Sequence, residues 1–100
     1  MIRHRADSNQ QATVRFLRSI PGVSVEVVSG GVCAFDLVVG LGGRSYLFEL
    51  KRSAKAKLKP SQIAFGQTWR GHWRRVNNVK EILDDLGIKF NEKYLPKVEA

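Results

Sequence analysis

Apolar residues recur along the chain at two spacings, one typical of an amphipathic helix and the other of a strand. Residues 7–20 carry apolar side chains on one helical face, and Pro21-Gly22 predicts the end of that helix. Residues 23–28 alternate between apolar and polar as a strand does, before a turn at Ser29-Gly30-Gly31. The same reasoning predicts the remaining elements: strands over 35–40 and 45–51, a helix from Pro60 to about Thr68, a strand over 73–76, and a helix capped by Asn77 or Asn78 that ends at Leu86.

The length of 100 residues is close to the common size of one domain, so 1–100 is expected to form a single unit. Residues 88–100 are expected to be a C-terminal extension, either packed on the domain or serving as an interface arm. No apolar run approaches the roughly 20 residues of a membrane span, and the basic N-terminus leads into polar residues instead of a signal-peptide core. The single cysteine, Cys33, cannot form an internal disulfide. We therefore expect a cytoplasmic protein with no membrane contact.

Basic charge is concentrated in the first four-fifths of the chain. Residues 1–80 hold 14 Lys and Arg against four acids, whereas 81–100 hold three against five, and the resulting +10 and −2 give the net charge of +8. Such a cationic body attracts nucleic acid through counterion release. On charge alone, the alternative is a generically basic protein without such a partner. Nucleic acid is the expected partner, and two of the four acids within the basic stretch, Asp36 and Glu49, require an explanation.

Asp36 and Glu49 are expected to face each other across a hairpin. If residues 41–44 form the loop between the second and third strands, facing residues have numbers that sum to 85. Directly opposed side chains have Cβ atoms about 5 Å apart, so two like charges there repel each other. Lys51 falls on the same face as Glu49 at the strand end. Two carboxylates and an ammonium there suit a hard divalent cation such as Mg²⁺, unless Lys51 merely bridges two solvated acids at the surface.

The residues around this hairpin resemble a known nuclease signature. Asp36, followed after 13 positions by Glu49-Leu50-Lys51, resembles the PD-(D/E)xK phosphodiesterase motif. Residues 30–40 look like the glycine-rich approach and Asp strand of the small VRR-NUC-type nucleases of phages and their hosts, and residues 46–51 look like their metal strand. Residues 58–62 and 68–71 are similar to the family's following helix and its exit. The likeness covers roughly residues 5–87 in the right order, and this combination is more specific than a bare Asp and Glu-x-Lys.

This resemblance implies an α/β fold with a restriction endonuclease-like core, a small mixed sheet of about four strands flanked by helices. It also implies a magnesium-dependent DNA endonuclease, with manganese as a substitute and branched or four-way DNA as a candidate substrate. Asp36, Glu49 and the backbone carbonyl of Leu50 would bind the metal. Lys51 would orient or activate the attacking water and stabilise phosphate charge, and Gln62 would contact metal-bound water or Lys51.

Some positions depart from the family pattern or have a simpler role. Many relatives carry an acid in the first helix where this chain has Gln10, so the site is expected to hold one metal, to act slowly, or to use Asp7. Capping the first helix is the simpler role for Asp7. Phe35 replaces a Pro that supplies no ligand. Capping is also the alternative role for Gln62, weakened because Lys59 at the expected cap cannot accept helical N–H groups.

Basic residues after the third strand and around the last strand are expected to contact the DNA backbone, with solvated surface as the alternative. They are Arg52, Lys55, Lys57, Lys59, Arg70, Arg74 and Arg75. Trp69 and Trp73 are interpreted as core or interface residues in preference to base-stacking platforms. His4 and His72 lack ligand spacing and are assigned to no metal.

Paired cuts in duplex or junction DNA need two active sites, so a two-fold homodimer is expected. Phe90, Tyr94 and Leu95 are the candidates for its apolar contacts. Two other classes of function remain open. One is a non-catalytic nucleic-acid-binding module on the same fold, with Gln10 as a sign of lost activity. The other is an RNA-binding protein whose acids are incidental.

Overall fold

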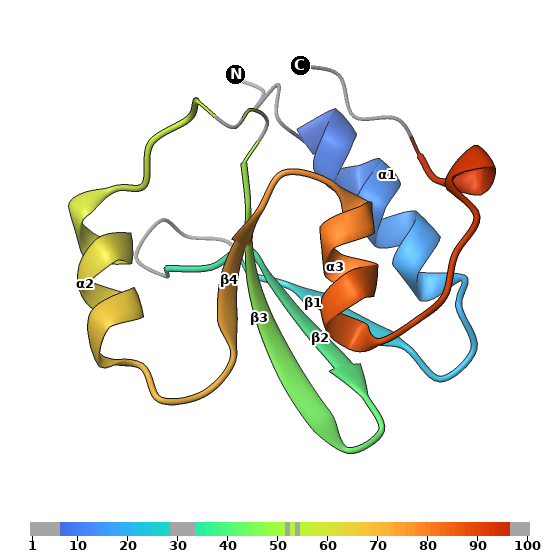
Figure 1. Cartoon of the computed structure of the whole chain (residues 1–100), viewed down its shortest axis with the longest axis horizontal. Coiled ribbons are helices and arrows are strands. Elements are labelled where there is room, and N and C mark those ends of the chain that lie inside the picture. The colour runs from blue at the N-terminus through green and yellow to red at the C-terminus, as the bar shows by residue number, and fades with distance from the viewer. Residues whose placement is uncertain (1–6, 29–33, 52, 54, 97–100) are drawn as a thin grey trace.

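The structure is a computed structural model that describes residues 7–28, 34–51, 53 and 55–96. Within these residues, helices flank a four-stranded sheet, which confirms the predicted α/β class (Figure 1). The elements are α1 (Asp7–Arg18), β1 (Ser24–Val27), β2 (Leu37–Leu41), β3 (Arg44–Leu50), α2 (Pro60–Thr68), β4 (Trp73–Val76), α3 (Val79–Leu86) and the short 3-10 helix η1 (Glu92–Tyr94). None of the described helices has the length and apolar character needed to span a membrane.

The sheet is mixed, with strand order β1-β2-β3-β4. β1, β2 and β3 pair antiparallel, whereas β3 and β4 pair parallel. The chain passes from β3 to β4 through α2, because parallel neighbours require a crossover. β3 therefore lies inside the sheet, as its apolar centre predicts. Figure 1 shows α2 on one side of the sheet and both α1 and α3 on the other.

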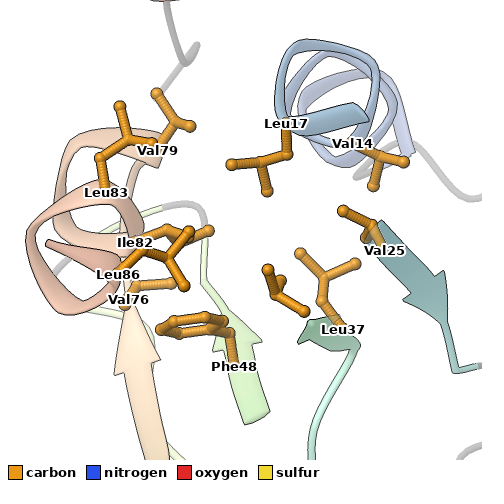
Figure 2. Packing of buried hydrophobic residues seen from close by; sticks show 11 residues of the cluster. Val14, Leu17, Val25, Leu37, Phe48, Val76, Val79, Ile82, Leu83 and Leu86 are labelled. Carbon is orange, nitrogen blue, oxygen red and sulfur yellow. The ribbon is translucent and has the colours of Figure 1, made fainter. Parts of the chain in front are cut away.

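The hydrophobic core lies between the sheet and the pair α1 and α3 (Figure 2). Leu17 of α1, Phe48 of β3 and Leu83 of α3 are fully buried there. Burying apolar side chains of this size stabilises a fold by about 1.5–3 kcal/mol each before entropy is counted. The apolar core fills this face of the sheet, so the other face is the one available for a polar site.

The β2–β3 hairpin closes with a tighter loop than the four residues expected. Leu41 pairs with Arg44, so only Gly42 and Gly43 form the turn. Both glycines have positive φ, 62° and 79°, as a two-residue hairpin turn with the twist of the strands requires. The register is nevertheless the predicted one, because Gly40 pairs with Ser45 and the numbers of facing residues sum to 85.

Other element ends differ from prediction by one or two residues. The expected helix over 7–20 ends at Arg18, where the Ser19 hydroxyl donates to Phe16 O (2.6 Å) and Ile20 N donates to Leu17 O (3.1 Å). Ile20 still packs against the core, which explains why its apolar character extended the helical pattern. The strands expected over 23–28, 35–40 and 45–51 run over 24–27, 37–41 and 44–50. The predicted turn at 29–31, Cys33 and His4 lie outside the described residues.

The last helix and the C-terminal extension agree with the predictions made from the sequence. Asn78 caps α3 by accepting a hydrogen bond from Glu81 N (3.0 Å), and Gly87 ends it with φ 75°. Phe90 and Leu95 pack against the core cluster, so this part of the extension is packed on the domain. Tyr94 is 69% exposed. Of the three expected dimer contacts, two are therefore partly occupied by the protein's own core.

Candidate active site

The predicted catalytic residues gather on the face of the sheet opposite the core. Side chains alternate between faces along a strand, so a core-facing Phe48 places Glu49 on the other face. Asp36 immediately precedes β2 and Lys51 immediately follows β3. Gln62, in the first turn of α2, is 4% exposed and reaches the same place. These four residues thus meet at one end of the β2–β3 pair.

Asp36 is held by the backbone of β3. Its amide donates to Phe48 O (2.8 Å), which extends the hairpin ladder by one residue. Its carboxylate oxygen Oδ2 accepts a hydrogen bond from Leu50 N (2.9 Å). The carboxylate therefore lies over the end of β3, where Glu49 and the Leu50 backbone also lie.

Glu49 is 5% exposed and has polar partners on two sides. Lys51 Nζ lies 3.2 Å from Glu49 Oε2. The Gln62 side chain also lies beside the Glu49 carboxyl group, where its hydrogen-bonding capacity lowers the pKa of that group. Because Gln62 Oε1 accepts from Lys59 N (2.8 Å), the amide NH₂ group is the donor left for Glu49.

Gln62 also performs the capping role that was its alternative assignment. The bond to Lys59 N satisfies a backbone donor at the start of α2. The expectation that Lys59 at the cap position argues against capping was wrong, because the bond uses the lysine's backbone amide and not its side chain. Gln62 thus ties the beginning of α2 to the carboxylate on β3.

Both carboxyl groups resist ionisation in this environment. Burial raises the pKa of Asp36 above its ordinary value, although the hydrogen bond from Leu50 N and the charges of Lys51 and Lys59 lower it. Burial and the negative charge of Asp36 raise the pKa of Glu49, against the lowering effects of Lys51 and Gln62. Two half-desolvated carboxylates that repel each other favour a bound cation, because it offsets both costs.

The donor set fits a hard divalent cation. Among the described residues no three His, Cys, Asp or Glu side chains cluster, so the protein offers two carboxylates, with the Leu50 carbonyl at the same strand end. Mg²⁺ is commonly held by one or two carboxylates, with water and substrate phosphate completing its coordination. Gln10 is half-buried on α1, the helix whose buried residues line the core, and Asp7 is the first residue of α1.

The expected DNA-contacting residues separate into different locations. Lys55, Lys57 and Lys59, which follow β3, and Arg70, which follows α2, are exposed. Arg52 lies outside the described residues. Arg74 and Arg75 are consecutive in β4, so their side chains leave opposite faces of the sheet.

Arg74 lies on the α3 side of the sheet, where it forms ion pairs with Asp85 and Glu81. His72 lies in the same network. Its Nε2 is 2.8 Å from Asp85 Oδ2, and its Nδ1 accepts from Leu47 N (3.1 Å). The structure therefore does not bring Arg74 to the candidate active site.

Trp73 is a supporting residue whose connection to the site the sequence did not reveal. Its Nε1 donates to Ala34 O (3.0 Å), two residues before Asp36. Its ring packs edge-on against Phe65 of α2 and lies so close to Gly66 that an added Cβ would be 2.8 Å away. Trp69 is 45% exposed. The parallel register of β4 on β3 places Trp73 there, and no local sequence pattern specifies that register.

The four-stranded mixed sheet with its flanking helices is an α/β fold. A solved structure described as a VRR_NUC domain superposes on 88% of this chain and 100% of its own length, with a TM-score of 0.65 and 19% sequence identity. The fold is therefore of the VRR-NUC type, as the sequence predicted. No family model matches the chain, and no curated protein sequence matches it.

Proposed function

We propose that the protein is a metal-dependent DNA endonuclease that hydrolyses phosphodiester bonds. The observation that carries this proposal is the pair Asp36 and Glu49, two acids of raised pKa beside Lys51 at one strand end. A fold gains no stability from placing two such acids together, so a functional ligand is the simplest account of them. The likeness to a VRR_NUC domain supports the same reaction class.

Each residue has a distinct role in this proposal. Asp36, Glu49 and the Leu50 carbonyl would hold magnesium, or manganese in its place. The bound ion would supply Lewis-acid stabilisation of the phosphoryl oxygens. Lys51, whose side chain is 15% exposed, orients the attacking water and stabilises the charge that develops on the phosphate. Gln62 fixes the orientation of Glu49 through its amide.

The direct test is incubation with supercoiled, linear, flapped and four-way DNA, with and without magnesium or manganese. Cleavage is expected only with metal, and a preference among the four substrates would identify the DNA structure that the site accepts. Glu49→Ala is the matched inactive control. Absence of cleavage on every substrate at every metal concentration would contradict the proposal.

A non-catalytic nucleic-acid-binding module is the second candidate. The observation that favours it is the Lys51–Glu49 ion pair of 3.2 Å, which partly neutralises Glu49 without a metal. Such a module would bind DNA and cut it in no variant. Binding and cleavage measured on the same preparation separate the two candidates.

We also propose a two-fold homodimer, because paired cuts need two sites. Tyr94 is the predicted contact residue that remains well exposed. Sedimentation at tens of micromolar protein is expected to show a dimer. A monomer that produces only single-strand nicks would remove the dimer and leave the chemistry in place.

A further inference from the structure

Arg75 lies beside the candidate active site but is bonded to the protein's own backbone. In the parallel ladder it is the partner of Glu49, and it therefore lies on the same face of the sheet. Its Nη2 donates to Ser53 O (2.9 Å) and to Ala56 O (2.5 Å). Both carbonyls belong to the segment that joins β3 to α2. One guanidinium group therefore links β4 to the chain that leaves the catalytic strand.

Two hydrogen bonds to Ser53 shape the described part of the segment that Arg75 holds. Ala56 N donates to Ser53 O (3.0 Å), and Lys55 N donates to Ser53 Oγ (3.0 Å). We call Ser53 and residues 55–57 the basic turn, because Lys55 and Lys57 extend from it and are exposed. Neither lysine forms an ion pair with any residue that the structure describes.

The ends of the same segment are fixed independently of Arg75. Lys51 N donates to Val76 O (2.8 Å), and Asn77 Nδ2 donates to Lys51 O (3.3 Å), which holds the start of the segment to the end of β4. Lys59 N donates to Gln62 Oε1, which holds its end. Loss of the Arg75 bonds would therefore release the basic turn without releasing the catalytic residues on either side.

We propose that Arg75 is a positioning residue that holds the basic turn so that Lys55 and Lys57 meet the DNA backbone beside the carboxylates. The inference rests on the proposed function, because it concerns how the same site binds its substrate. A turn fixed before binding spares the complex the entropic cost of ordering it, so the effect belongs in DNA affinity and not in metal binding. In this proposal Arg75 acts through the basic turn, whereas the sequence predicted a direct contact between Arg75 and phosphate.

A double-mutant cycle in metal-free buffer separates the indirect role from a direct contact. Arg75→Lys keeps the positive charge but loses the planar fork that bonds two carbonyls. We expect DNA affinity to fall by about tenfold and the salt slope to fall by about one to two units. Lys55→Ala/Lys57→Ala should give a similar loss. Adding Arg75→Lys to that pair should cost nothing further, because the turn no longer carries its cations.

The matched control is Arg18→Lys. Arg18 also donates from Nη2 to a backbone carbonyl, Val25 O (2.8 Å), but it lies at the end of α1. Its substitution should leave DNA affinity and salt slope at their parental values. If Arg75→Lys does not fold, Arg75→Gln, which keeps amide donors without the charge, takes its place in the cycle.

Hydrogen exchange tests the turn without DNA. The Ala56 amide should be protected in the parental protein and exchange faster in Arg75→Lys, while the Leu50 amide keeps its protection. An unprotected Ala56 amide in the parental protein would overturn the inference, as would additive losses in the cycle. If the losses of DNA affinity are additive but the protein still cuts DNA, only the positioning role of Arg75 is refuted. If the parental protein binds no DNA, the proposed function is refuted as well.

Discussion

Metal binding should be visible in the stability of the protein, and Asp36→Asn is the perturbation that isolates it. In the metal-free protein the Asp36 carboxylate is partly desolvated and repels Glu49. Asparagine preserves the shape, and its amide oxygen can still accept the hydrogen bond that Leu50 N donates to Oδ2 (2.9 Å). The substitution therefore removes a charge and a metal ligand with little change to the fold. The metal-free variant should melt at the parental temperature or above it at neutral pH.

The expected shift follows from mass action on this single site. With magnesium at about ten times its dissociation constant, binding to the folded state alone adds about 1.4 kcal/mol to the free energy of unfolding. For a domain of this size each kcal/mol moves the melting temperature by about 4–8 °C, so a rise of about 6–11 °C is expected. In Asp36→Asn the rise should largely disappear, because one of the two carboxylates is gone.

The assay is a melting series over magnesium and manganese concentration, with potassium chloride matched in ionic strength. Asp84→Asn is the control, because Asp84 is an exposed acid on α3. It should shift with metal as the parental protein does. An unchanged parental melting temperature across the whole titration would refute the metal site. An equal rise in Asp36→Asn would show that the metal binds elsewhere.

Three further results are expected from the same site. Glu49→Gln should lower the cleavage rate by several orders of magnitude, while metal-free DNA affinity stays equal or rises. Lys51→Ala should lower both the cleavage rate and the DNA affinity. A Glu49→Gln protein that cuts at the parental rate would show that this residue is not catalytic. Because burial raises the pKa of Asp36, the folded protein binds a proton that the unfolded chain releases, so the parental protein should gain unfolding free energy relative to Asp36→Asn as pH falls from neutral through that raised pKa. Urea unfolding across pH measures this difference, and a difference that grows in the opposite sense would contradict it. Trp73→Phe loses the 3.0 Å hydrogen bond to Ala34 O, so it should lower the free energy of unfolding by about 1 kcal/mol and weaken metal binding. Calorimetric titration measures the metal affinity, and an unchanged affinity would show that the bond does not position Asp36.

The hairpin was predictable because two local signals agree. Gly42-Gly43 permits the tight turn with positive φ at both positions, and the alternation of β2 and β3 then fixes which residues face each other. Asp36 and Glu49 meet as a consequence of these two facts. The caps of α3 were predictable for the same reason, since Asn78 and Gly87 act within one turn of the helix.

The support around the hairpin depends on contacts that no local signal specifies. Parallel pairing of β4 with β3 is set by the crossover and by core packing, so the sequence did not place Arg75 opposite Glu49 or Trp73 opposite Leu47. The separation of Arg74 from Arg75 is different. Consecutive strand residues face opposite sides, so the predicted strand over 73–76 already implied that the two arginines cannot line one groove.

The distribution of ion pairs gives the sheet two electrostatically different faces. The acids Glu81 and Asp85 of the C-terminal part pair with Arg74 on the α3 side. On the α2 side, Lys55 and Lys57 form no ion pair with any described residue, although both follow the strand that carries Glu49. Acidic side chains thus offset the charge of Arg74 on the α3 side, whereas Lys55 and Lys57 are left without an ion pair among the described residues. In the proposed function these two lysines would meet a phosphate backbone that approaches the candidate metal ligands, which is the charge arrangement that a phosphodiesterase site requires.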